Sequence, residues 1–147
     1  MFIEYDEKIV EGALLFFREF IKNHNDYFKH LTTLSTGSIL IIIAIIEGVF
    51  DNPECIILIA ISFFFFLVSL IGALYMLQVL NGYNKALFFT LVNILQVTEE
   101  TTNKVQDELK RMTDSIDKSA KVFHPITDFS FLLGIVAFLV FTFINFI

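Results

Sequence analysis

Residues Leu31–Phe50 read LTTLSTGSILIIIAIIEGVF, and this stretch decides the fold. Its single charged residue is Glu47, close to its end. Two further segments, Cys55–Leu80 and Phe129–Ile147, contain no charged residue. Each of the three segments is about 19 to 26 residues long, which suffices for a helix to cross a hydrocarbon core about 30 Å thick. The sequence therefore predicts three transmembrane helices.

The composition and the N-terminus support this interpretation. Hydrophobic residues make up 56% of the 147 residues, whereas soluble domains average about 45–50% even with glycine counted. The length is that of one domain. The N-terminal residues MFIE lack a basic region followed by an apolar stretch, so we expect no cleaved signal peptide.

The basic residues predict the orientation. All ten Lys and Arg lie in two segments, Lys8–Lys29 and Lys85–Lys121, whereas the charged residues between the first two spans are the acids Asp51 and Glu54. Basic residues concentrate in the cytoplasmic loops of membrane proteins. We therefore expect the N-terminus and the middle segment in the cytoplasm, with the short loop and the C-terminus outside.

The segments outside the spans have helical patterns. Residues 1–30 form a cytoplasmic amphipathic helix, which leads into the first span without an intervening proline or glycine. Residues 31–80 hold transmembrane helices 1 and 2, residues 81–124 a cytoplasmic helical hairpin, and residues 125–147 transmembrane helix 3. The expected fold class is all-α, an integral membrane protein with three transmembrane helices extended by a cytoplasmic helical bundle.

The hairpin carries an apolar seam with the heptad spacing of a coiled coil, from Phe88 to Ile116. The seam weakens near Thr101–Asn103, and we place the turn there because a straight helix could not return to the membrane. Asn81–Asn84 are expected to loosen the helix after the second span, and Pro125 to separate the hairpin from the third span. An alternative is that residues 84–97 lie flat on the inner leaflet.

Motifs for catalysis are absent from the sequence. There is no metal-ligand spacing of His, Cys and carboxylates, no glycine-rich phosphate loop and no nucleophile elbow. We therefore expect a protein that is not an enzyme and that has no metal or cofactor.

One face of the first span differs from the others, because it begins with hydroxyl groups and ends with a carboxylate. A carboxylate facing lipid is unfavourable, so it should face protein, water or headgroups. Small residues also form packing seams between membrane helices, as in Ser62, Ser69 and Ala73 of the second span. In an oligomer, the first-span face could instead line a pore. The pore-lining candidates are Thr33, Thr36, Gly37, Leu40, Ala44 and Glu47.

The basic residues of the hairpin are candidates for binding an anionic ligand. They are Lys104, Lys110, Arg111, Lys118 and Lys121. The acids Glu100, Asp107 and Asp114 precede three of them by four residues, the spacing of intrahelical ion pairs. The stripe is therefore either a self-paired, solvated helix face or a face for an anion.

Two segments also resemble a known group of proteins. LTTLSTGSILIIIAII and FSFLLGIVAFLVFTFINFI resemble the first and last spans of small bacterial membrane effectors of anti-phage systems, the Hailong-type and SLATT-like effectors. The matching positions are Leu34, Ser35, Gly37, Gly134 and Asn145. The resemblance implies an oligomeric channel in the bacterial inner membrane, held shut by a nucleotide or oligonucleotide that a partner enzyme makes.

These observations predict a pore or membrane-perturbing effector that is gated by its cytoplasmic helices. Three spans are too few to enclose a channel, so we expect a homo-oligomer in contact with membrane lipid, with a tetramer favoured. The alternative is a non-conducting membrane scaffold or accessory subunit that docks a partner through its heptad helix.

The orientation can be tested with topology reporters. A reporter fused after Ile147 should report a location outside the cytoplasm, and one inserted at Asn103 a cytoplasmic location, because every basic residue lies in the two segments named above. Paired alkaline phosphatase and fluorescent-protein fusions measure this. An external signal at Asn103 would overturn the predicted arrangement.

Overall fold

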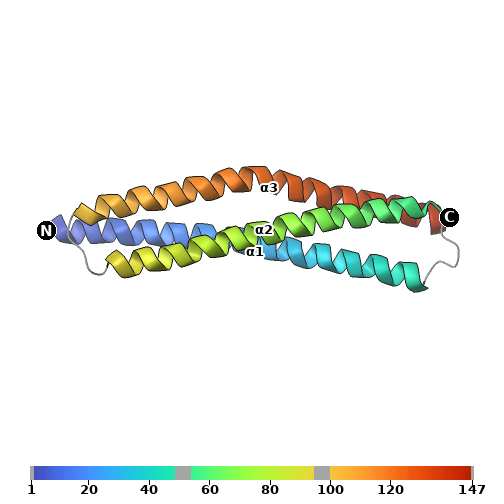
Figure 1. The fold of residues 1–147 in the computed structure, drawn as a ribbon, viewed down its shortest axis with the longest axis horizontal. Coiled ribbons are helices and arrows are strands. Elements are labelled where there is room, and N and C mark those ends of the chain that lie inside the picture. Colours follow the sequence, from blue (N-terminus) through green and yellow to red (C-terminus); the bar gives the residue numbers. More distant parts are fainter. Residues whose placement is uncertain (1, 49–53, 95–99, 147) are drawn as a thin grey trace. The chain divides into compact units, whose positions relative to one another are not determined.

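A computed structural model describes residues 2–48, 54–94 and 100–146, which form three helices (Figure 1). They are α1 (Phe2–Gly48), α2 (Ile56–Ile94) and α3 (Glu100–Phe146). Each contains a segment long and apolar enough to cross a membrane, namely Glu11–Ile46, Ile56–Leu87 and Asp107–Asn145. The predicted all-helical fold with three potential membrane-spanning helices is therefore confirmed. The first of them continues unbroken from the N-terminal helix, as expected.

The three helices contribute to two compact units. Unit 1 consists of Met1–Tyr27 and Met76–Lys121, and unit 2 consists of Phe28–Tyr75 and Val122–Ile147. Unit 2 therefore contains most of the three apolar segments, and unit 1 contains most of the charged residues. Each unit takes one segment from each helix.

In unit 2, α2 is joined to both of the other helices by buried serine side chains. The Ser69 and Ser35 hydroxyls lie 3.3 Å apart, with Ser35 as the donor, and connect α2 to α1. The Ser62 hydroxyl donates to the backbone carbonyl of Gly134 at 2.7 Å and connects α2 to α3. All three serines are completely buried. These bonds satisfy polar groups that neither lipid nor a hydrocarbon core could satisfy.

Two glycines permit α2 and α3 to approach closely. A Cβ atom added at Gly134 would lie 3.0 Å from the Phe66 ring, and one at Gly72 would lie 2.6 Å from Cγ2 of Thr127. A larger residue at Gly72 would force the Thr127 side chain to shift, and one at Gly134 would require the Phe66 ring to move. The apolar core of unit 2 surrounds these contacts and comprises Ile42, Ile59, Phe66 and Phe141. The small residues of α2 and α3 therefore form packing seams within the chain.

The start of α2 is held against the end of α3 by Asn145. Its side-chain oxygen accepts a hydrogen bond from the Glu54 backbone N–H at 2.7 Å, and its side-chain nitrogen donates to the Glu54 carbonyl at 3.0 Å. Cys55 follows with a φ of 53°, and its carbonyl accepts a turn hydrogen bond from the Leu58 N–H at 2.9 Å, where α2 begins. Asn145 thus closes this end of unit 2.

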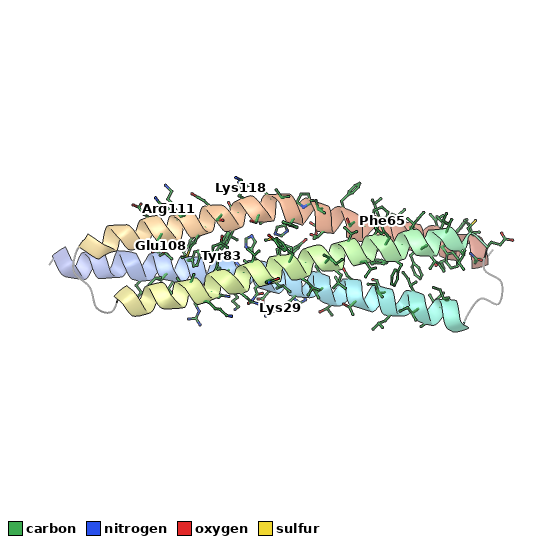
Figure 2. The ribbon with its side chains drawn as sticks, viewed as in Figure 1. Lys29, Phe65, Tyr83, Glu108, Arg111 and Lys118 are labelled. Carbon is green, nitrogen blue, oxygen red and sulfur yellow. The ribbon has the colours of Figure 1, made fainter. Side chains whose placement is uncertain are left out.

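Unit 1 has its own apolar core, to which all three helices contribute. Its buried residues are Phe17 and Ile21 of α1, Met76, Leu80 and Leu87 of α2, and Leu109, Ile116 and Ala120 of α3. Leu109 and Ile116 belong to the predicted heptad seam, and they are buried within their own chain. The Tyr83 hydroxyl also donates to the Ser115 hydroxyl at 2.7 Å and joins α2 to α3 (Figure 2).

Three predicted breaks are wrong. Thr101–Asn103 do not form the turn, because α3 already begins at Glu100 and includes them. Thr and Asn are favourable near the start of a helix, and an acid there complements the helix dipole. These residues therefore suit the first turn of α3 as well as they suit a loop. Asn81–Asn84 also lie within α2, between the buried residues Leu80 and Leu87.

Pro125 does not separate two helices either, because α3 runs through it. A proline inside a helix costs about 3 kcal/mol, partly because it lacks an N–H group. Two residues later, the buried Thr127 hydroxyl makes local contacts with the carbonyl oxygens of Phe123 at 2.8 Å and His124 at 3.0 Å. The alternative in which residues 84–97 leave the bundle is disfavoured, since α2 continues to Ile94 and Leu87 is buried.

The core of unit 1 can be tested by placing a charge in it. Ile116→Asp should lower the free energy of unfolding by several kcal/mol, because the side chain is completely buried. Lys118→Ala is the control, since its side chain is exposed and exposed ion pairs contribute about 0–1 kcal/mol. Circular dichroism during thermal unfolding in detergent measures both variants. A destabilised Lys118→Ala with a stable Ile116→Asp would show that the seam is assigned to the wrong side of α3.

Candidate functional site

The predicted pore face lies on the outer side of α1 in unit 2. Thr33, Thr36, Leu40 and Ala44 are exposed, with Leu40 61% accessible. A Cβ atom added at Gly37 would meet nothing within 4 Å, unlike those at the two glycines described above. The side chain of Glu47, the last predicted member, lies outside the described residues. The five described members are thus brought to one side of α1, away from the helix contacts of their own chain.

The opposite side of α1 provides the contacts to α2 and α3. Leu31, Ser35 and Ile42 are buried there, and Ser35 makes the bond to Ser69. The helix therefore has two distinct faces that both carry small or hydroxyl residues. The inner face packs against α2 and α3 of the same chain, and the outer face makes no such contacts and can meet another chain, lipid or water.

The threonine hydroxyls near the start of the predicted pore face are bonded to the backbone of α1 itself. The Thr33 hydroxyl donates to the Lys29 carbonyl at 3.0 Å, and the Thr32 hydroxyl donates to the Phe28 carbonyl at 2.8 Å. A threonine that bonds to its own helix does not need another partner. The hydroxyls are therefore compatible with contact to another helix and with the wall of an aqueous path.

The rest of the unit 2 surface is strongly apolar. Large hydrophobic side chains are exposed on all three helices, among them Ile41, Ile57, Phe64, Ile71, Phe129, Leu132, Leu139 and Phe143. Soluble monomers rarely expose contiguous apolar patches larger than a few hundred Å². Such a surface suits a hydrocarbon environment, where the helices satisfy their own backbone groups.

The interior of unit 2 is occupied by side chains. Ile42, Ile59, Phe66 and Phe141 pack together in its core, and the hydroxyl of Ser62 is bonded to the backbone of α3. A path for ions within one chain would have to displace this core. A conducting path therefore requires surfaces from more than one copy.

The predicted anion-binding residues lie on the solvent side of α3 in unit 1. Lys110, Arg111, Lys118 and Lys121 are exposed, and Figure 2 shows Arg111 and Lys118 projecting away from the ribbon. Lys104 has no described side chain. The Lys121 amino group lies 3.9 Å from the Asp117 carboxylate, so at least one of these bases has a local acidic neighbour. The four described bases thus lie on the exposed side of α3.

Within residues 11–46, 54–87 and 107–145, no three His, Cys, Asp or Glu residues lie close enough together to hold a metal ion. The chain has no match among models of protein families, among curated protein sequences or among solved structures. The resemblance to anti-phage effectors therefore rests on the two sequence segments alone.

Two structural roles were not predicted from the sequence. Asn145 is one of the positions that carry the resemblance, but the sequence does not predict its two bonds to the Glu54 backbone. The Tyr83–Ser115 bond was also missed. The sequence does show that Asn145 is a polar side chain near the end of an apolar helix, and such a side chain needs a hydrogen-bond partner. No signal identified Glu54 as that partner.

Removing the basic charges tests the anion site. Replacing Lys104, Lys110, Arg111 and Lys118 by Gln should weaken binding of a fluorescent single-stranded oligonucleotide, and wild-type binding should fall steeply with salt because neutralised phosphates release counterions. Fluorescence anisotropy across a salt series measures both effects. Lys85→Gln, which removes an exposed cation of α2, is the control. Unchanged binding in the fourfold variant would leave the self-paired face as the explanation.

Proposed function

We propose that the protein forms a homo-oligomeric membrane pore, or membrane-perturbing effector, and that unit 1 gates it. One observation carries the proposal. The outer face of α1 bears Thr33, Thr36, Gly37 and Ala44 on a surface that is otherwise occupied by large apolar side chains. Gly37 has open space where a second helix could approach. Lipid requires no such residues.

The proposed path runs along this face between copies of α1. Hydroxyl groups lie at one end, Leu40 in the middle and Glu47 toward the other end. A ring of leucine or alanine side chains can stop ions by excluding water, and a ring of carboxylates attracts cations. Leu40 and Ala44 therefore supply the proposed constriction, and Glu47 supplies an acidic mouth.

The proposed gate follows from the continuity of the helices. Each helix belongs to both units, so a ligand or partner that changes the packing of unit 1 acts on the same helices that cross the membrane. A ligand shifts such an equilibrium only through its different affinity for the two states. The exposed bases of α3 provide a surface for an anionic ligand, such as the oligonucleotide that the resemblance implies. A role in anti-phage defence fits a pore kept shut by such a ligand.

The scaffold interpretation is less well supported. It requires the heptad seam of α3 to be free for a helix of a partner protein. Leu109 and Ile116 of this seam are instead buried in the core of unit 1. A partner helix could reach them only by displacing α1 or α2.

Ion flux into liposomes tests the pore. Leu40→Ser should increase leak several-fold by wetting the constriction, and Glu47→Gln should reduce the preference for cations. A fluorescent potassium readout, with and without a potassium gradient, measures both. Leu132→Ser is the matched control, because it makes the same change at an exposed position of α3 and should leave the flux unchanged.

The outcomes separate two kinds of error. A protein that conducts under no condition refutes the pore. A protein that conducts while Leu40→Ser and Glu47→Gln are silent shows that the path does not run along α1. The Ser62 and Ser69 face of α2 could not line the path instead, because both side chains form hydrogen bonds inside the chain.

A further inference from the structure

The exposed side of α2 changes its character at Tyr75. Ile71, one turn before it, is an apolar side chain that is 64% accessible. Gln78 and Asn81, which follow Tyr75, are exposed polar side chains. The surface of α2 is therefore apolar only as far as Tyr75, although the uncharged segment of the sequence continues to Leu80 and beyond.

Packing within the chain explains why apolar residues continue past Tyr75. Met76 and Leu80 are completely buried and belong to unit 1. Their apolar side chains serve this core and need no lipid. The hydropathy of a segment averages over all sides of a helix, whereas only the exposed side meets the surroundings. The exposed side places the edge of the apolar surface at Tyr75, about 8 Å along the helix before Leu80.

The other two helices show the same change from polar to apolar. On α1, Lys29 and His30 are exposed, and the exposed apolar side chain of Leu34 follows one turn later. On α3, Lys121 is exposed, and the next residue, Val122, is an exposed apolar side chain. Each helix thus has a position where its exposed side becomes apolar.

Two ring contacts place these positions in one layer at the end of unit 2. The ring centroids of Phe28 in α1 and His124 in α3 lie 4.8 Å apart. Those of Tyr75 in α2 and Phe123 in α3 also lie 4.8 Å apart. Because Phe123 and His124 are neighbours, all three helices meet in this layer. Tyr75 is 49% accessible, and tyrosine is typical of the boundary between hydrocarbon and lipid headgroups.

The apolar surface beyond this layer has the height of a hydrocarbon core. At 1.5 Å per residue, residues 30–47 of α1, 56–75 of α2 and 123–145 of α3 rise about 26, 29 and 33 Å. A hydrocarbon core is about 30 Å thick, and each headgroup region adds about 5–7 Å. Asp128 is half-buried and lies about 6 Å along α3 from His124, which is within a headgroup region.

We propose that the acyl chains of a phospholipid bilayer cover this surface of unit 2, and that Lys29, Tyr75 and His124 lie in the headgroup layer at its edge. The Lys29 amino group can reach lipid phosphates while its methylene groups stay in apolar surroundings. Met76 and Leu80 then lie outside the hydrocarbon, covered by protein. The inference rests on the proposed function for its membrane environment, and it adds the residues that meet the headgroups.

Thiol labelling on α2 tests the position of the edge. In a Cys55→Ser background, Gln78→Cys should react several-fold faster with a membrane-impermeant maleimide than Ile71→Cys, because only the second lies in hydrocarbon. The two positions are seven residues apart and on the same side of α2, so they differ in depth. Proteoliposomes opened by freezing and thawing expose both membrane faces to the reagent. Equal protection of both cysteines, or equal labelling of both, overturns the proposal.

Tryptophan fluorescence keeps the test valid if a cysteine variant fails to insert. The chain contains no tryptophan, so one introduced tryptophan reports depth without background. Phe64 is exposed and lies about 17 Å along α2 from Tyr75. Phe64→Trp should be quenched most by lipids brominated near the ends of their acyl chains, and Tyr75→Trp by lipids brominated near the headgroup. Equal depths for the two tryptophans would contradict the proposal.

The membrane edge and the pore can fail separately. A chain that shows the predicted difference in labelling but conducts no ions sustains this inference and refutes the pore. A chain that conducts ions while Gln78→Cys is as protected as Ile71→Cys sustains the pore and refutes the inference.

Discussion

The close approach of α2 to α3 is the contact on which unit 2 depends. In lipid, burial of apolar side chains does not drive helices together, so the association relies on close packing and on hydrogen bonds between helices. Gly134 admits the Phe66 ring, and Gly72 admits Thr127. The same approach brings the Ser62 hydroxyl within 2.7 Å of the Gly134 carbonyl. A residue larger than glycine would require Thr127 or the Phe66 ring to move.

This packing also determines which surface is left for function. The small and polar residues of α2 and α3 are used inside the chain, where they satisfy one another. The corresponding residues of α1 are divided between two faces, with Ser35 inward and Thr33, Thr36 and Gly37 outward. An outward face of this composition has no role in the fold of the single chain. Self-association through α1 is the role that we propose for it.

The sequence predicted the number of helices better than their ends. Uncharged runs of sufficient length are a strong signal, and the heptad spacing of Leu109 and Ile116 correctly indicated a buried seam. The turn near Asn103 and the break at Pro125 were wrong, because local preferences for loops are weaker than the packing of a long helix. The outward direction of the Gly37 face could not be predicted either. Periodicity shows which residues share a face, but only the contacts of Ser35 show which face meets α2.

The central claim is that several copies assemble around α1, and electron cryo-microscopy of the purified protein in lipid nanodiscs tests it most directly. The account predicts a closed ring of subunits with α1 nearest the symmetry axis and with Leu40 and Ala44 facing that axis. A single three-helix chain in the nanodisc, or a ring whose axis is lined by α2 or α3, would contradict it.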